Sequence, residues 1–423
     1  MSDLLAKLSD YVYETVPVNP KKALNIMSFG YSAFGLRCRL PKKPFMPARL
    51  YMNRIAASAT VGPLRHPENA MLTNIFMPCE IFQALEMNIM FPEAIACCLA
   101  FISGQRAFIE SAEANGIPPT LCSYHKCLIG LALTGVMPKP LFIVNTTLAC
   151  DANQLSFRRL EEYYGIKRKV IDVPYEDNEE NLEHLVRQLK ETAIFAQENS
   201  SKTLTEEKLA LAIARSKRTI ENYKEYLELR ADRHIYDNMT SEMLAVFATH
   251  VLLGSEQAEK FTADLVEQTR KIPVTKHSGV RLLWVHTLPF WQPVLRELLN
   301  LNDRCEVVAC DMTFDGLCGT QESDPYRYMA KRLISNSFNG SSDRRIELVA
   351  EYAKKLNADG VVWYCHWGCK QTAGASASAK EYFEQAGIPV LILDGDGCDR
   401  NNVNDGQTAT RMEAFIELLE KKA

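Results

Sequence analysis

The stretch GVVWYCHWGCKQTAGASASAKEYFEQAGIPVLIL, residues 360–393, decides the fold. It contains a short apolar run at residues 360–364, a segment of helix length, and a second apolar run at residues 389–393. Short apolar runs bounded by turn residues are typical of buried strands, and a connection of helix length is typical of two parallel strands in one sheet. The stretch therefore predicts a strand, a helix and a second, parallel strand.

The same alternation extends outward from this stretch. Residues 281–286 and 306–310 form two further apolar runs before it, and residues 141–147 and 169–174 form two more in the first half of the chain. Alternating strands and helices favour parallel sheets that carry helices on both faces. We therefore predict an α/β fold with two small parallel-sheet domains, together with helical N-terminal and inter-domain segments.

The length of 423 residues exceeds what one hydrophobic core usually supports, so we expect more than one domain. Between the two sets of strands lie three segments with helical patterns, at residues 181–197, 206–230 and 241–253. This helical zone indicates where the domains are joined. The predicted organisation has four parts, which are a helical N-terminal region at 1–65, a first α/β domain at 66–200, a helical connecting region at 201–275 and a second α/β domain at 276–423.

The composition excludes several classes of protein. Apolar residues make up 47% of the chain and charged residues 24%, which is typical of a globular protein. A net charge of −4 gives no general attraction to nucleic acid or to an anionic membrane surface, so we expect neither as a partner. The longest apolar run, residues 94–103, is too short to cross a bilayer, and the first residues do not resemble a secretory leader. We expect a cytoplasmic location.

Thirteen cysteines are many for a cytoplasmic chain of this length. Thiols stay reduced in the cytoplasm and disulfides are rare there, so metal or redox chemistry is the leading explanation. Taken singly, each cysteine can also be a small buried apolar residue. The distribution is more informative than the count, because Cys150, Cys365, Cys369 and Cys398 each follow a predicted strand closely.

Three cysteines from distant segments can meet at one point. Cys122 and Cys150 are separated by about one helix and one strand, so loops at one sheet edge can bring them together. Cys369 lies in the other half, so a shared site would occupy the cleft between domains. Three thiolates can hold three irons of a cubane cluster and leave the fourth iron open. The sequence contains no Walker-type loop and no complete dinucleotide fingerprint, so any ATP hydrolysis would require another protein.

Other readings of these residues stay open. Cys127 and Cys365 are either packing residues or ligands, and a structural zinc site could use Cys122, Cys127, Cys365 and Cys369. The histidines near the predicted strand ends are either acid–base groups or hydrogen-bonded core residues. They are His125, His286 and His366.

A longer stretch, GVVWYCHWGCKQTAGASASAKEYFEQAGIPVLILDGDGCDRNNVNDGQTATRMEAFIELL at residues 360–419, resembles the C-terminal signature of the 2-hydroxyacyl-CoA dehydratase family, whose relatives include benzoyl-CoA reductase subunits. Three motifs in the first half match the family's pattern in the same order. They are Pro-Cys-Glu at 78–80, Gly-Ile-Pro at 116–118 with Cys-Ser-Tyr at 122–124, and Thr-Thr-Leu-Ala-Cys-Asp at 146–151. The resemblance covers residues 70–423 and is weakest in the helical middle.

The resemblance implies an oxygen-sensitive [4Fe–4S] cluster between two α/β domains, held by Cys122, Cys150 and Cys369. It implies that an (R)-2-hydroxyacyl-CoA substrate loses water to give an enoyl-CoA through a ketyl radical. It also implies two protein partners, a related second subunit in a heterodimer and a separate ATP-hydrolysing iron–sulfur activator that supplies one electron. The identity of the acyl group does not follow from the sequence.

The resemblance also suggests roles outside the cluster. Glu80 and His366 are candidate catalytic residues, with Glu80 lining the cleft or, alternatively, acting as a carboxylate at a helix start. His366 and Lys370 could orient the substrate or tune the cluster. Gln407 and Arg411 are further candidates on the last helix. The additional cysteines Cys79, Cys127, Cys365 and Cys398 leave the size of the cluster open, so a related reductase subunit, a double-cubane protein and a subunit that only relays electrons remain alternatives.

Overall fold

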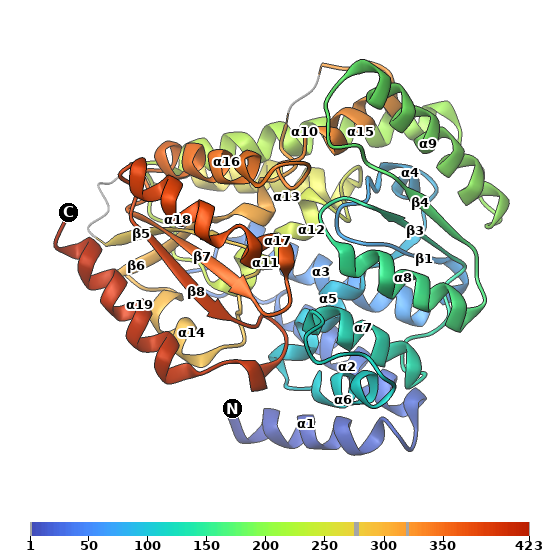
Figure 1. Ribbon diagram of the computed structural model, residues 1–423, viewed down its shortest axis with the longest axis horizontal. Helices are drawn as coiled ribbons and strands as arrows, with labels where there is room; N and C mark the ends of the chain where they lie inside the picture. Colours follow the sequence, from blue (N-terminus) through green and yellow to red (C-terminus); the bar gives the residue numbers. More distant parts are fainter. Residues whose placement is uncertain (1, 275–278, 319–320, 423) are drawn as a thin grey trace.

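The computed structural model describes residues 2–274, 279–318 and 321–422 (Figure 1). It contains two four-stranded parallel sheets, which confirms the predicted α/β fold. The first sheet has the strand order β2-β1-β3-β4, and the second has the order β6-β5-β7-β8. The first sheet is formed by β1 (Ala70–Leu72), β2 (Asn88–Met90), β3 (Phe142–Thr146) and β4 (Arg168–Ile171). The second is formed by β5 (Val280–Val285), β6 (Cys305–Cys310), β7 (Gly360–His366) and β8 (Val390–Gly395).

Each sheet is buried under helices because its strands are apolar on both faces. Every residue of β5 and β7 is buried, for example, which requires cover on either side. In the first half the helices are α4 (Glu80–Ala84), α5 (Pro92–Phe101), α6 (Arg106–Ala114), α7 (Ser123–Leu133), α8 (Asp151–Tyr164) and α9 (Glu179–Glu198). In the second half they are α14 (Pro293–Leu299), α15 (Pro325–Ile334), α16 (Ser342–Lys355), α17 (Lys370–Gly374), α18 (Ser376–Gln385) and α19 (Asp405–Glu420).

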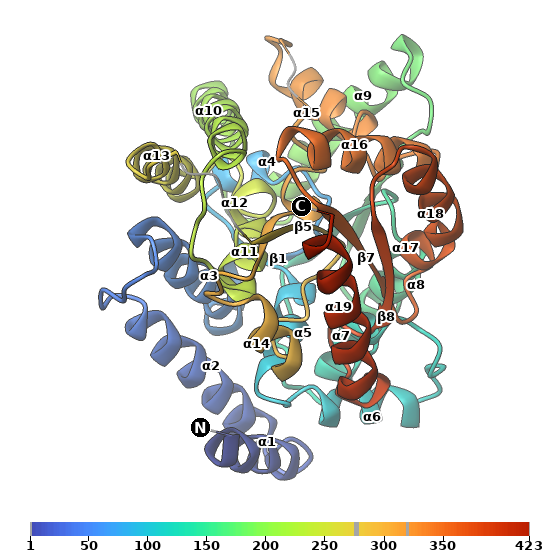
Figure 2. The ribbon, with the colours of Figure 1, turned by 90° about the vertical axis from the view of Figure 1, so that its left-hand side faces the viewer.

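The remaining helices either precede the first strand or connect the two halves. Three of them precede the first strand, namely α1 (Ser2–Thr15), α2 (Pro20–Arg37) and α3 (Pro47–Arg65). The connecting zone holds α10 (Glu206–Arg230), α11 (Met239–Leu244), α12 (Val246–Thr249) and α13 (Glu256–Arg270). In Figure 2 the long helices α10 and α13 lie beside each other, with α3 below them. In the described part of the chain, no helix combines the length and the apolar character needed to cross a membrane.

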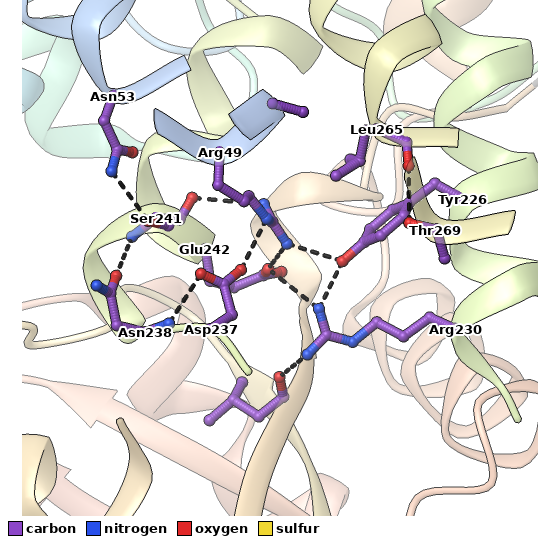
Figure 3. Close-up of polar contacts among 12 residues, drawn as sticks. Arg49, Asn53, Tyr226, Arg230, Asp237, Asn238, Ser241, Glu242, Leu265 and Thr269 are labelled. Atoms are coloured by element: carbon purple, nitrogen blue, oxygen red, sulfur yellow. Dashed lines mark hydrogen bonds and ion pairs between the residues drawn. The ribbon is translucent and has the colours of Figure 1, made fainter. Parts of the chain in front are cut away.

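A buried network of charged side chains fastens α3 and α10 to the second sheet, and Figure 3 shows the part of it around Arg49 and Arg230. We call the residues Arg49, Arg230, Arg281, Asp237, Glu242 and Glu306 the arginine network. Arg49 on α3 pairs with Asp237 and with Glu242, each at 2.7 Å. Arg281 on β5 pairs with Glu306 on β6 at 2.5 Å, and Arg230 on α10 lies 3.6 Å from the same carboxylate. These pairs fix the N-terminal helices to the second half of the chain.

Candidate functional site

The loops at the carboxyl ends of the strands in both sheets open onto one cavity of about 540 Å³. Cys122, Cys150 and Cys369 all line it. Cys150 follows β3 in the first sheet and Cys369 follows β7 in the second, while Cys122 precedes α7. The structure therefore brings together the three cysteines that the sequence grouped. We call this space the thiol cavity.

Each of these cysteines sits immediately before a helix. Cys122 is the N-cap residue of α7, Cys150 that of α8 and Cys369 that of the short α17. Helix N-termini carry a partial positive charge and favour thiolates over thiols. Consistent with this, the backbone N–H of His125 favours the ionised form of Cys122 and so opposes the effect of burial on its pKa.

Each cysteine also lies beside a histidine. The Sγ–Nε2 distance is 3.2 Å between Cys122 and His366, 3.4 Å between Cys150 and His125, and 3.5 Å between Cys369 and His286. The rings of His286 and His366 are nearly parallel, with their centroids 5.6 Å apart. All three histidines line the thiol cavity. The sequence left open whether these histidines pack in the core or act at a site, and the structure places each against one thiol.

The hydrogen bond at Nδ1 of His366 decides which ring nitrogen carries the proton. Burial lowers the pKa of His366, so the ring is neutral at pH 7. Its Nδ1 accepts the backbone N–H of Gly397 at 2.9 Å, so the proton of the neutral ring is on Nε2. His366 therefore donates a hydrogen bond to the sulfur of Cys122 and stabilises negative charge on it.

In the pair of His125 and Cys150 the hydrogen bond runs in the opposite direction, from the thiol to the imidazole. Burial lowers the pKa of His125 to about 4, so this ring is also neutral at pH 7. The hydroxyl of Ser156 donates to the backbone oxygen of Ala152 and therefore accepts from Nδ1 of His125, at 2.8 Å. Nε2 of His125 is left as an acceptor for the thiol proton of Cys150.

The thiols themselves are hard to ionise without a nearby cation. Burial raises the pKa of Cys122 well above its usual value and that of Cys150 to about 12. Negative charge on Cys369 raises both values further, since the sulfurs face the same space. A thiolate-binding metal group would supply the missing positive charge, and soft thiolate ligands suit iron–sulfur clusters.

The arrangement fits a cluster better than a single ion. Among the described residues, no three His, Cys, Asp or Glu side chains lie close enough to hold one metal ion. A cubane places irons and sulfides between its thiolates and so needs them further apart around an open space. The structure does not bring the four cysteines of the alternative zinc site to this cavity, because Cys127 lies against Cys398 and neither Cys127 nor Cys365 lines the cavity.

One backbone contact and one side-chain hydrogen bond bring the two halves of the chain together at the cavity. Gly368 has a φ of +74°, and a Cβ atom there would lie 2.5 Å from the backbone nitrogen of Cys122. Only glycine allows this approach. Next to it, the hydroxyl of Ser123 donates to the buried carboxylate of Asp396 at 2.6 Å. Ala149 and His286 also have positive φ values, 67° and 78°, so two of the loops that carry cysteines and histidines hold backbone strain.

Of the other predicted site residues, all of them described by the structure, only Lys370 lies at the cavity. Glu80 does not line the thiol cavity: its carboxylate is fully buried and accepts from Ser216 at 2.8 Å and from Arg332 at 2.5 Å. Lys370 stands exposed at the cavity wall. Gln407 and Arg411 lie on α19, where Gln407 is exposed and Arg411 contacts the end of β8. Of the additional cysteines, the described wall of the cavity includes none of Cys79, Cys127, Cys365 and Cys398.

Several wall residues were missed by the sequence analysis, among them Cys97, Cys98 and Glu93. Glu93 lies in the first turn of α5 and lines the cavity. Its Oε2 atom is buried and has no hydrogen-bond partner among the described residues, and burial raises the pKa of Glu93 to about 8. An acid in the first turn of a helix is so common that the local sequence carries no signal for it.

Comparison with known proteins identifies relatives over most of the length of the chain. The family model described as 2-hydroxyglutaryl-CoA dehydratase, D-component, matches residues 74–419. The (R)-phenyllactyl-CoA dehydratase alpha subunit of Clostridium sporogenes is 20% identical, covering 82% of this chain and 88% of its own. The lactoyl-CoA dehydratase subunit alpha of Anaerotignum propionicum is 20% identical over 81% and 89%. A benzoyl-CoA reductase subunit of Thauera aromatica is 22% identical over 81% and 87%.

Proposed function

Because the chain belongs to the family described as 2-hydroxyglutaryl-CoA dehydratase, D-component, we propose that it is the cluster-binding subunit of an (R)-2-hydroxyacyl-CoA dehydratase. Such an enzyme is a lyase that removes water to give an enoyl-CoA. The observation that carries the proposal is the convergence of Cys122, Cys150 and Cys369, from loops of both halves, on one cavity. The relatives named as dehydratase alpha subunits support it independently.

The reaction sets a clear demand on the site. The proton to be removed lies on the β-carbon of the thioester, where it is not acidic, so ordinary base catalysis cannot remove it readily. A [4Fe–4S] cluster, when bound, would supply a Lewis-acidic iron and a place to store one electron. In this proposal Cys122, Cys150 and Cys369 hold the cluster.

The chain's own residues have defined tasks in this proposal. Nε2–H of His366 holds negative charge on the sulfur of Cys122, and Nε2 of His125 accepts the hydrogen bond of the Cys150 thiol until the cluster binds. The apolar wall excludes water from the reacting thioester. Glu93 holds a proton inside the cavity near neutral pH, because its pKa is raised to about 8. No task at the thioester is assigned to Glu80, since it lies outside the cavity wall.

The proposed partners are inferred from the names of the relatives and from the sequence. The relatives are named as subunits, so we propose that this chain works in a heterodimer with a related second subunit. We also propose a separate ATP-hydrolysing iron–sulfur activator as the electron donor, since the sequence lacks a Walker-type loop. The substrate is an acyl-CoA.

Anaerobic reconstitution tests the proposal. The chain, its co-encoded partner and an activator should together release water from at least one 2-hydroxyacyl-CoA ester, and should contain about four irons in this chain. Cys150→Ala should lose the brown colour and most of this iron. Cys305→Ala is the control, because Cys305 is a buried thiol on β6 that lies outside the cavity. Full iron content in Cys150→Ala would contradict the ligand assignment.

A second candidate is a reductase subunit, which the match to the benzoyl-CoA reductase of Thauera aromatica favours. Product analysis separates the two. A dehydratase converts a 2-hydroxyacyl-CoA into an enoyl-CoA, whereas a reductase leaves that ester intact and reduces an aromatic acyl-CoA. About eight irons in this chain would favour the double-cubane alternative instead.

A further inference from the structure

Part of the wall of the thiol cavity is formed by apolar side chains. Phe91 and Phe247 meet edge to face, with ring centroids 5.8 Å apart, and Phe76 and Phe338 lie 5.1 Å apart. Met243 on α11 adds a flexible thioether to the same wall. These side chains come from both halves of the chain and from the connecting helices, so the wall is a built surface of the folded protein. It offers contact to an apolar group and little to a polar one.

Positive charge is scarce in this wall. Among the described residues that line the cavity, Lys370 is the only lysine or arginine, and it is exposed at the surface. Arg345 lies behind the wall, where it pairs with Asp311 at 2.7 Å and donates to Thr372 at 2.8 Å. Its guanidinium also stacks on Phe338 at 4.1 Å. Arg345 is therefore committed to internal partners and does not offer its charge to the cavity.

The raised pKa of Glu93 shows that this wall disfavours negative charge. Burial raises the pKa of this carboxyl to about 8, so the cavity already disfavours the buried carboxylate that the chain places there. Asp151, which also lines the cavity, is exposed. A carboxylate carried in by a substrate would meet the same surroundings. Burying such a group without a cation is costly, whereas burying an apolar group is favourable.

We propose that this site selects 2-hydroxyacyl-CoA esters with an apolar acyl group and rejects those that carry a second carboxylate, such as 2-hydroxyglutaryl-CoA. The inference rests on the proposed function and narrows it to one substrate class. Phe91, Phe247 and Met243 contact the acyl chain. Selectivity arises from the missing counter-charge as much as from the apolar contact.

Two matched esters test the selectivity by binding alone. One is 2-hydroxyglutaryl-CoA, and the other is 2-hydroxy-5-methylhexanoyl-CoA, in which an isopropyl group of similar size replaces the terminal carboxylate. Calorimetric titration of the reconstituted complex should give a Kd at least tenfold lower for the isopropyl ester. Equal or tighter binding of 2-hydroxyglutaryl-CoA would overturn this inference and leave the dehydratase proposal standing. If neither ester binds more tightly than CoA itself, the proposed function fails.

Two variants locate the source of the preference. Phe247→Leu should weaken binding of the isopropyl ester several-fold and leave the dicarboxylate unchanged. Phe82→Leu is its control, because Phe82 is fully buried against Phe142 outside the cavity and should change neither Kd. Lys370→Gln should change the two affinities by the same factor. A loss confined to 2-hydroxyglutaryl-CoA would make Lys370 the partner of a substrate carboxylate and would overturn the inference.

Discussion

The arginine network and the thiol cavity are both buried and both polar, yet they are organised in opposite ways. In the network, Arg49, Arg230 and Arg281 each face a carboxylate of the same chain. The space beside the network is only about 10 Å³. In the thiol cavity, thiols face neutral histidines around about 540 Å³. In the network each cation has its counter-charge within the chain, whereas the cavity is arranged for charge that the chain does not supply.

This difference separates polar groups that hold the fold from polar groups that bind something. A buried charge with its partner in place contributes to one defined structure, and removing either partner is expensive. A buried thiol with a raised pKa and an open space in front of it gains most when a cation arrives. The contrast predicts that damage to the network is seen in the apo-protein, while damage to the cavity is seen mainly in its loading.

The largest effect should come from Arg49→Met. The substitution leaves Asp237 and Glu242 buried without their main cation, so the free energy of unfolding should fall by about 3–5 kcal/mol. Urea denaturation of the apo-protein measures this. Arg65→Met is the control, because Arg65 is an exposed residue on the same helix and should cost well under about 1 kcal/mol. Equal midpoints for the two variants would mean that the network does not stabilise the fold.

Low pH should have the second-largest effect on stability, because it weakens the arginine network. Burial disfavours the Glu306 carboxylate, but His234, Arg230 and Arg281 outweigh burial and lower its pKa to about 2. A carboxyl with a lowered folded pKa stabilises the protein above its unfolded pKa of about 4.5 and loses that contribution as the pH falls towards 2. The lost stability is about 3 kcal/mol. Urea midpoints of the apo-protein should therefore drop between pH 5 and pH 3, and Glu306→Gln should flatten this part of the profile.

The sequence predicted the longer strands and the grouping of the cysteines, because both depend on local pattern. Six strands are short segments rich in apolar residues, whereas β1 and β2 have three residues each, too few to show a pattern. The cysteines follow strands or precede helices, and parallel topology carries such positions to one edge.

The partners of each side chain could not be predicted, since they come from distant segments. Glu80 is bound by Arg332, which lies 252 residues further along the chain, so a motif that suggested a cleft residue gave an ion pair in the core. In the same way, His366 meets Cys122 across 244 residues. Local sequence places a histidine near a strand end but does not say which thiol it will face.

Gly368→Ala should lower both the stability of the fold and the iron content, with a loss of stability between those of the other variants. A methyl group at a φ of +74° and 2.5 Å from the backbone of Cys122 must push the two halves apart, which should lower the free energy of unfolding by about 1–3 kcal/mol. Because Cys122 and Cys369 lie on either side of this contact, iron retention should fall more steeply than stability. Gly374→Ala, in the next helix and with open space around it, should leave both unchanged.

The smallest effect on stability should come from Ser156→Ala. This variant separates an effect on the thiol cavity from an effect on the fold. Loss of the 2.8 Å bond to Nδ1 of His125 should cost about 1 kcal/mol or less, yet it frees the ring to place its proton on Nε2 and so to donate to Cys150. Iron content should stay near four per chain, while the midpoint potential of the cluster should rise, since donated hydrogen bonds stabilise the reduced state. Ser200→Ala removes a similar hydroxyl, which lies just after α9 and donates to Ala196 on that helix, and should leave the potential unchanged. An unchanged potential in Ser156→Ala would mean that His125 does not tune the group held by Cys150.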